Sequence, residues 1–281
     1  SVSRGLGDVY KRQKVYILNV NEGSMPYRKA VLEAHLEEER RLFYVGMTRA
    51  KKKLCLYCVV VSFDKEEESM AKIKIAALQT NVYEDKMENL YQLEKLLELP
   101  ELQGADLITM GEMFNCPYQT SNFPLYAESE GGECWSFCSR LASRHRVYLS
   151  AGSMPEKDED GNIYNTAYVF DREGRQIAKH RKMHLFDINV KNGQCFKESD
   201  TLTPGDQVVV FDTEFGKMGI CVCYDFRFPE LPRLMAQQGA RIILVPAAFN
   251  MTTGPAHWEI MFRQRAVENL SLIHISEPTR H

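Results

Sequence analysis

The chain has 281 residues, of which 44% are hydrophobic and 26% are charged. This composition is that of an ordinary globular protein, and it excludes a disordered or fibrous chain. The formal net charge of -3 excludes a broad basic face for non-specific nucleic-acid binding. No apolar run reaches the ~18 residues of a membrane-spanning helix, and eight cysteines are too few for a disulfide scaffold. We therefore predict a cytoplasmic protein with reduced thiols.

The two ends of the chain are related to each other as inverted nucleic-acid sequences. With a suitable choice of codons for residues 270–280, LSLIHISEPTR, the reverse complement translates as SRGLGDVYKRQ, which is residues 3–13. This string resembles a transposon-end adapter used in sequencing libraries. We therefore expect residues 1–13 and 270–281 to be adapter-derived, and we exclude both from the predicted fold.

The first natural segment is predicted to be residues 14–63. It begins with the apolar run KVYILNV, which is typical of a buried strand and ends at the turn signal NEG. An amphipathic helix with a basic end is predicted across residues 36–53. Cys55 and Cys58 have the spacing of half a zinc site, but no second pair accompanies them. We therefore interpret them as two core thiols on a strand.

The order of NEGSMP and EEERRLFYVGMTRAKKKL resembles the last motifs of the UvrD-type superfamily 1 DNA helicases. The resemblance implies that Arg49 matches the arginine that reaches the ATP γ-phosphate in that family. A phosphate-binding loop ending in Gly-Lys-Ser or Gly-Lys-Thr is absent from the whole sequence. We therefore do not expect this helicase C-terminal fragment to be an ATPase.

A junction is predicted at residues 64–71. The charged run DKEEES is either a solvated linker or the in-frame translation of a ribosome-binding sequence that precedes Met70. We adopt the second interpretation, in which Met70 is a start codon. Residues 14–63 and 70–269 are then pieces of two separate genes, and the second contains a predicted domain at 72–269.

From residue 72 onward, strand-like and helix-like segments alternate. Helices are predicted at 85–99, 133–146, 229–238 and 256–269, and strands at 73–78, 106–110, 147–151, 163–170, 207–212, 217–222 and 241–245. This order predicts an α/β fold with helices covering a sheet. In such folds the ligand site gathers at the carboxyl ends of strands.

Three side chains with reactive chemistry stand at or near the ends of these strands. Glu112 follows the strand DLITM, although a surface glutamate is the simpler interpretation of this residue alone. Cys223 ends the strand KMGICV before a turn whose backbone N–H groups favour thiolate, whereas Cys221 is expected to pack in the core. Lys182 follows the strand-like IAKH, and beside a thiolate and a carboxylate it would stabilise a tetrahedral intermediate.

The motifs GEMFNCPY, HRKMHLFD and GICVCYDFRFPE occur in the order found in the nitrilase, or carbon-nitrogen hydrolase, superfamily. FNMTTGPAHWE further resembles the omega-amidase branch of that family. The resemblance covers residues 72–269 and implies a four-layer αββα sandwich that forms a homodimer. It implies Glu112 as general base, Lys182 as stabiliser of the intermediate and Cys223 as nucleophile.

The resemblance also implies that Glu198 orients the substrate and the lysine, and we add Tyr118 and Tyr224 as substrate-orienting residues. In the family the chain continues past the position of Asn269. We therefore expect the hydrolase domain to be incomplete at its C-terminus, with an exposed sheet edge and with loss of activity.

These residues predict an amidase that acts on the terminal amide of a small dicarboxylic acid monoamide through a cysteine thioester. The partners are the amide and water, with no cofactor, no membrane and no nucleic acid for this domain. His180 and His184 have a metal-pair spacing, but no third ligand is placed and no metal is predicted. The alternatives are a deaminated-glutathione or other aliphatic amidase, an ATP-dependent DNA helicase fragment, and a natural fusion with an interaction module.

Overall fold

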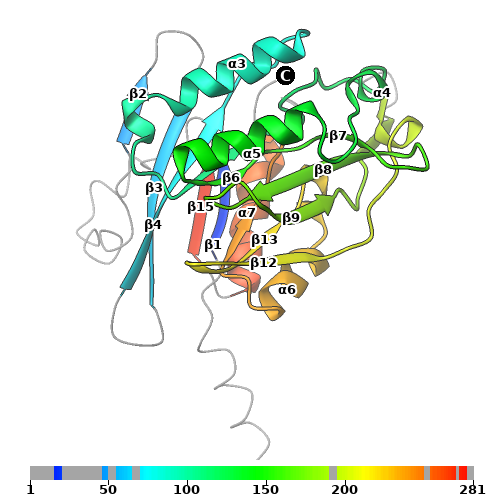
Figure 1. Cartoon of the computed structure of the whole chain (residues 1–281). Helices are drawn as coiled ribbons and strands as arrows, with labels where there is room; N and C mark the ends of the chain where they lie inside the picture. Colours follow the sequence, from blue (N-terminus) through cyan, green and yellow to red (C-terminus); the bar gives the residue numbers. More distant parts are fainter. Residues whose placement is uncertain are drawn as a thin grey trace, which may run out of the picture.

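Two β-sheets lie face to face between two layers of helices (Figure 1). The structure is a computed structural model, and it describes residues 16–20, 46–49, 55–64, 70–189, 195–249, 254–269 and 272–276. The α/β fold predicted from the alternation of strands and helices is confirmed.

The larger sheet has the strand order β2-β3-β4-β5-β6-β8-β7, and β9 pairs with β8. Its strands are β2 (Gly46–Arg49), β3 (Cys55–Asp64), β4 (Met70–Gln79), β5 (Leu107–Met110), β6 (Tyr148–Ser150), β7 (Met154–Lys157), β8 (Ile163–Phe170) and β9 (Gln176–Arg181). Strands β4, β5 and β6 run parallel, and the other pairs are antiparallel.

Side chains on β4 alternate between the two faces of the larger sheet, as the two-residue period of a strand requires. Ile73 packs in the same buried cluster as Ile220 of the second sheet. Leu78 points the other way, into the cluster formed with helices α3 (Lys86–Leu97) and α5 (Glu133–His145). The larger sheet is therefore buried on both faces at β4.

The second sheet has the order β12-β13-β14-β1-β15. Its strands are β1 (Tyr16–Val20), β12 (Val209–Thr213), β13 (Gly216–Ile220), β14 (Ile242–Leu244) and β15 (Leu272–Ser276). Helices α6 (Glu230–Gln237) and α7 (Gly254–Glu268) cover its outer face through Leu231, Met235, Trp258 and Phe262. The order of layers is therefore helix, sheet, sheet, helix.

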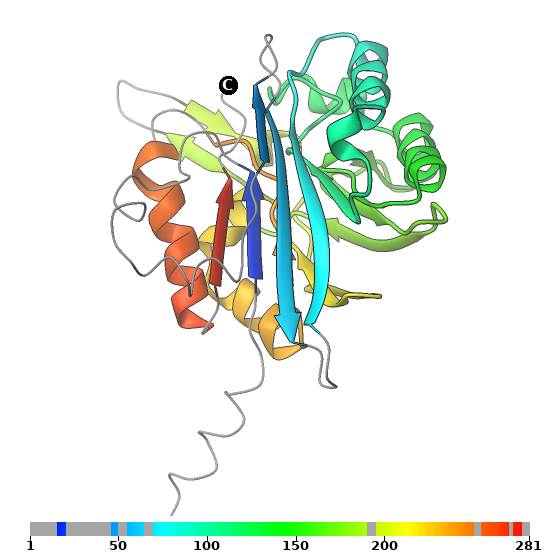
Figure 2. The same cartoon turned by 90° about the vertical axis from the view of Figure 1, so that its left-hand side faces the viewer.

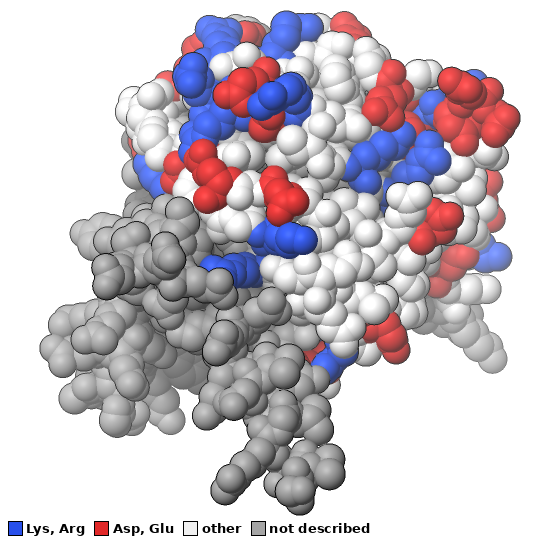
Figure 3. Space-filling view, turned by 60° about the horizontal axis from the view of Figure 1, so that its bottom comes forward, with Lys and Arg blue, Asp and Glu red and all other residues white. Residues whose placement is uncertain are grey.

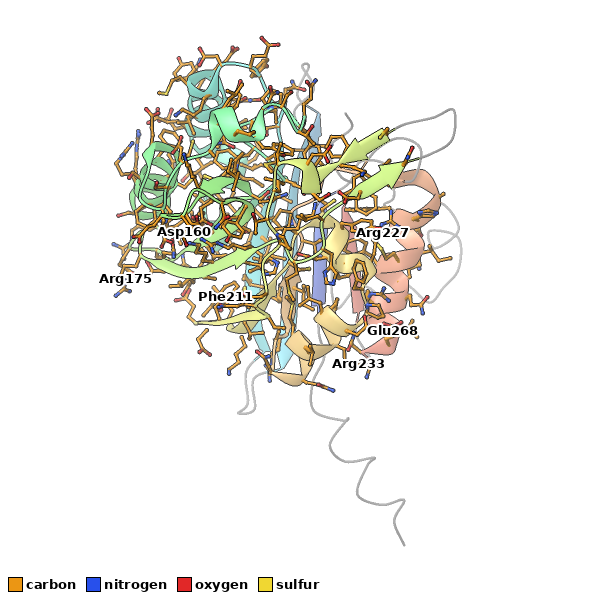
Figure 4. The ribbon with its side chains drawn as sticks, turned by 90° about the vertical axis from the view of Figure 1, so that its right-hand side faces the viewer. Asp160, Arg175, Phe211, Arg227, Arg233 and Glu268 are labelled. Carbon is orange, nitrogen blue, oxygen red and sulfur yellow. The ribbon has the colours of Figure 1, made fainter. Side chains whose placement is uncertain are left out.

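Helices α6 and α7 lie side by side (Figure 4). The Arg233 side chain on α6 donates to the carbonyl oxygen of Glu268 at 3.2 Å. The remaining elements are short, and they are α4 (Phe123–Tyr126), β10 (Asp187–Asn189), β11 (Cys195–Lys197), η2 (Pro100–Leu102), η3 (Glu198–Asp200) and η4 (Cys223–Arg227).

Two strands near the ends of the chain belong to the second sheet. Strand β1 confirms the strand predicted from the run KVYILNV, whereas β15 lies in residues 270–281, which we excluded from the predicted fold. Strand β1 pairs in parallel with β14 on one side and with β15 on the other, and both lie beside α7 (Figure 2). The edge of β14 that we expected to be exposed is therefore paired. The adapter origin of residues 1–13 and 270–281 stays a prediction.

The helix predicted across residues 36–53 is wrong at residues 46–49, which form β2. Strand β2 pairs with β3, whose β-branched and aromatic residues favour an extended chain, so sheet pairing overrides the helical pattern. Strand β3 also pairs with β4 over ten residue pairs across the predicted junction (Figure 2). Residues 65–69 of that junction lie outside the described residues.

Acidic and basic side chains are interspersed on the face that Figure 3 shows, with uncharged residues between them. This part of the surface carries no continuous field of one sign. Among the described residues, none of the helices combines the length and the apolar character that crossing a membrane requires.

The turns that follow β5 and β6 are in direct contact. Ser153 N donates to Gly111 O at 3.3 Å, and Phe114 N donates to Ser153 O at 3.0 Å. Gly152 has φ +59°, and a Cβ atom at this position would lie 2.0 Å from Gly111 O. Only glycine therefore allows the two turns to approach this closely.

We expect Gly152→Ala to lower the free energy of unfolding by ~3 kcal/mol or more, because a backbone clash adds to left-handed strain. The matched control is Gly104→Ala, since Gly104 has φ +71° with nothing within 4 Å of the added Cβ. The control should lose about 1 to 2 kcal/mol from strain alone. Urea unfolding followed by circular dichroism measures both, and equal losses would contradict the clash.

Candidate active site

Three buried side chains from three different strands meet in the interior. Glu112 follows β5, Lys182 follows β9 and Cys223 follows β13. Their exposed fractions are 2%, 0% and 6%. The structure thus brings together the carboxylate, the amine and the thiol that the sequence singled out.

Lys182 Nζ lies between two carboxylates. It is 2.8 Å from Glu112 Oε1 and 2.9 Å from Glu198 Oε2. Burial by itself lowers the pKa of Lys182, but the negative charges of Glu112, Glu198 and Cys223 outweigh burial and raise this pKa. The lysine is therefore a cation in the resting site.

Both oxygens of Glu112 are fixed by donors from separate parts of the chain. Asn165 Nδ2 donates to Oε1 at 2.8 Å, and the Tyr118 hydroxyl oxygen lies 3.2 Å from the same oxygen. Ala248 N donates to Oε2 at 2.9 Å. Together with Lys182, these donors hold the carboxylate in one orientation, which a base that acts on a neighbouring thiol requires.

Cys223 sits in a strained turn, with φ +48°. Its backbone N–H donates to Pro246 O at 2.8 Å, and its thiol is hydrogen-bonded to Glu112. Burial and the charge of Glu112 raise the pKa of the Cys223 thiol well above its usual range, although Lys182 partly opposes them. The expectation that the turn favours thiolate is therefore wrong for the resting site, because desolvation and a nearby carboxylate exceed the effect of the turn.

Glu198 and Tyr118 complete the buried network. Glu198 Oε2 accepts from Phe186 N at 2.7 Å, and Glu198 Oε1 accepts from the Tyr118 hydroxyl. Burial and the charge of Glu112 raise the pKa of Glu198, and Lys182 opposes this rise. The Tyr224 ring packs beside this network, with its centroid 5.2 Å from the centroid of the Phe186 ring.

Two buried polar residues of the site are absent from the sequence prediction. Asn165 is fully buried in the middle of β8, and an asparagine within an apolar strand is the signal that could have identified it. Asp225 is also fully buried, and it is 2.9 Å from His180 Nε2 and 2.9 Å from His184 Nδ1. The two histidines therefore contact a carboxylate, and the described residues contain no group of three or more ligands suited to a metal ion.

The predicted features of the N-terminal segment lie apart from this network in the sequence. Arg49 is the last residue of β2, and Cys55 and Cys58 lie on β3. The side chains of all three lie outside the described part of the structure. Residues 250–253 of the FNMTTGPAHWE motif lie outside it as well.

Comparison with known proteins places most of the chain in one family. Residues 74–270 match the carbon-nitrogen hydrolase family, and residues 12–60 match the UvrD-like helicase C-terminal domain. The chain is 46% identical over 209 residues to nitrilase homolog 2 of Dictyostelium discoideum, covering 74% of this chain and 64% of that protein. It is 44% identical over 211 residues to omega-amidase NIT2 of Mus musculus, covering 75% of this chain and 76% of that protein.

The fold is likewise similar to a solved structure, that of Saccharomyces cerevisiae Nit3, a member of branch 10 of the nitrilase superfamily. The TM-score is 0.65 at 38% sequence identity, covering 74% of this chain and 76% of that chain. The helicase-like match is confined to the N-terminal segment, whereas the hydrolase match contains every residue of the buried network. The chain belongs to the carbon-nitrogen hydrolase family.

Proposed function

We propose that the chain is an amidase that hydrolyses the terminal amide of a small dicarboxylic acid monoamide through a thioester on Cys223. The observation that carries the proposal is the buried contact of Glu112 with both Lys182 and the Cys223 thiol. A base, a cation and a nucleophile in mutual reach are the set that covalent acyl transfer requires.

The first half-reaction begins from the neutral thiol. Glu112 takes the proton from Cys223 Sγ as the sulfur attacks the amide carbonyl carbon, and the carbonyl oxygen becomes an oxyanion. The same proton passes from Glu112 to the amide nitrogen, the carbon-nitrogen bond breaks and ammonia leaves. The acyl group remains on Cys223 as a thioester.

The second half-reaction reverses these roles with water. Glu112 takes a proton from water, the hydroxyl adds to the thioester carbonyl, and the sulfur leaves with the returned proton. The product is the dicarboxylic acid. One carboxylate therefore serves as base and acid in turn, which its fixed orientation supports.

Lys182 and a backbone N–H are the groups that we assign to the oxyanion. The Lys182 cation is desolvated, and a charge in a dry site stabilises a developing oxyanion strongly. We do not assign the Cys223 backbone N–H to the oxyanion, because it already donates to Pro246 O. The backbone N–H of Tyr224 lies in the first turn of η4, where N–H groups lack intrahelical acceptors, so it is the second donor in our proposal.

The substrate class rests on similarity to the omega-amidases. The chain shares 44% identity with omega-amidase NIT2 of Mus musculus, and we infer that 2-oxoglutaramate and succinamate are representative substrates. We assign Glu198, Tyr118 and Tyr224 to substrate orientation. A cytoplasmic homodimer, and a boundary that separates residues 14–63 from the hydrolase domain at 72–269, remain predictions from the sequence.

A substrate panel tests the proposed function. The loss of activity expected from the sequence assumed an exposed edge at β14, and that edge is paired by β1 and β15. We therefore expect the 281-residue chain to release ammonia from 2-oxoglutaramate and succinamate with kcat/KM at least ~100-fold above that for an aliphatic amide without a distal carboxylate. Deaminated glutathione is the second comparison. Faster turnover of deaminated glutathione, or of the simple amide, would replace the proposed substrate class with that alternative.

The two neighbouring cysteines provide a matched pair for the nucleophile. Cys223→Ala should abolish ammonia release, because it removes the thiol that is hydrogen-bonded to Glu112. Cys221→Ala should retain turnover and lose stability by ~1 to 2 kcal/mol, because Cys221 is fully buried in the core between the sheets. Retained turnover in the Cys223 variant with loss in the Cys221 variant would reverse the assignment.

The pKa of the Cys223 thiol should respond to its two charged neighbours in opposite directions. Glu112→Gln removes the charge and the hydrogen bond that raise this pKa, so the midpoint of thiol alkylation should move to lower pH. Lys182→Met removes the charge that lowers it, so the midpoint should move to higher pH. Below the midpoint, the alkylation rate at a fixed pH reports the shift. Alkylation of Cys223 by iodoacetamide, followed by peptide mass spectrometry from pH 6 to pH 10, should therefore be faster in Glu112→Gln and slower in Lys182→Met, and slower alkylation in Glu112→Gln would contradict the assignment.

A further inference from the structure

The Asp225 carboxylate connects the turn that carries the nucleophile to the segment that carries the lysine. Its Oδ2 accepts from Val222 N at 3.0 Å, and its Oδ1 accepts from Met183 N at 3.0 Å. Val222 immediately precedes Cys223, and Met183 immediately follows Lys182. One side chain therefore bridges the backbone neighbours of two site residues that are far apart in the sequence.

Two histidines from the lysine segment extend the same bridge. His184 donates to Asp225 Oδ1 twice, through its backbone N at 2.8 Å and its Nδ1 at 2.9 Å. His180 Nε2 lies 2.9 Å from Oδ2. Because a carboxylate oxygen only accepts, both ring nitrogens carry a proton. The His184 ring also stacks on Phe228, with centroids 3.7 Å apart, so it contacts the chain just beyond the nucleophile turn.

Asp225 is fully buried, and the donors around it keep it ionised. Burial raises the pKa of an aspartate, but the hydrogen bonds from His180, His184 and Val222 N outweigh burial and lower this pKa. A buried carboxylate that accepts from both segments is costly to displace, since each donor would lose its partner in a dry interior. The bridge is therefore a rigid connection.

The nucleophile turn requires such a connection because its backbone is strained. Cys223 has φ +48°, a conformation that a residue with a side chain rarely adopts. Strained backbone persists only where the surrounding contacts determine it. The Asp225 bridge supplies such contacts on the side of the lysine segment. The hydrogen bond from Cys223 N to Pro246 O supplies another, just after β14.

We propose that Asp225 is a positioning residue for the amidase reaction, which holds the Cys223 turn against the Lys182 segment so that the thiol meets Glu112. This inference rests on the proposed function for its kinetic readout. Asp225 acts through the backbone N–H groups of Val222 and Met183, next to Cys223 and Lys182, and not through contact with the reacting atoms.

Asp225→Asn tests the proposal, because it preserves the shape and replaces one accepting oxygen by a donor. The matched control is Asp171→Asn, since Asp171 is a nearly buried aspartate that accepts from Glu173 N, Arg175 N and Arg175 Nε in a turn remote from the network. At equal folded fraction by circular dichroism, Asp225→Asn should lower kcat at least ~100-fold with KM within about threefold. Asp171→Asn should leave both within about twofold.

A kcat for Asp225→Asn within threefold of the Asp171 control would overturn the proposal. The rate of Cys223 alkylation by iodoacetamide is a second readout that needs no substrate. It should change at least ~5-fold in Asp225→Asn and stay unchanged in Asp171→Asn. If the unmodified chain lacks amidase activity, the proposed function fails while the alkylation rates still decide the positioning role.

Two variants of His184 keep the proposal testable if Asp225→Asn does not fold. The His184 side chain is 29% exposed, so substitutions there are tolerated better than in the core. His184→Asn retains a donor in the place of Nδ1, whereas His184→Ala removes it, and both lose the stack on Phe228. We expect kcat at least ~10-fold higher in the asparagine variant than in the alanine variant. Equal kcat values in the two variants contradict the proposal.

Discussion

The burial of Lys182 between Glu112 and Glu198 is the interaction on which the rest of the site depends. Two carboxylates share one fully buried cation. Removing the cation would leave uncompensated negative charge in the interior, which is strongly destabilising. Glu112 and Lys182 follow strands of the larger sheet, whereas Glu198 begins η3. This contact therefore also fixes how these three segments pack. The stability and the chemistry of the site therefore have the same origin.

The charge balance of the network explains why a neutral thiol suits the reaction. The carboxylates near Cys223 oppose a second negative charge, and they raise the pKa of the thiol. In the mechanism that we propose, the proton therefore moves to Glu112 only as the sulfur attacks and negative charge passes to the substrate oxygen, near Lys182. In this proposal the nucleophile rests uncharged, and the charged groups stabilise the transition state more than the ground state.

The sequence predicts the parts of the structure that depend on local pattern. The helices near 86–97 and 133–145 and the strands that precede Glu112 and Cys223 follow from periodicity and breakers. The strand at 46–49 could not be predicted, because its pairing with β3 is a long-range property that local periodicity does not contain. The Asp225 bridge was equally inaccessible, since its donors lie about 40 residues away in the sequence.

The most direct test of the account is the identification of the covalent intermediate. The 281-residue chain is mixed with a dicarboxylic acid monoamide, quenched in acid during turnover, and examined by intact-mass and peptide mass spectrometry. The account predicts an acyl adduct confined to the peptide that contains Cys223, with none in Cys223→Ala. An adduct on another residue, or full turnover by protein whose Cys223 has been alkylated, would contradict it.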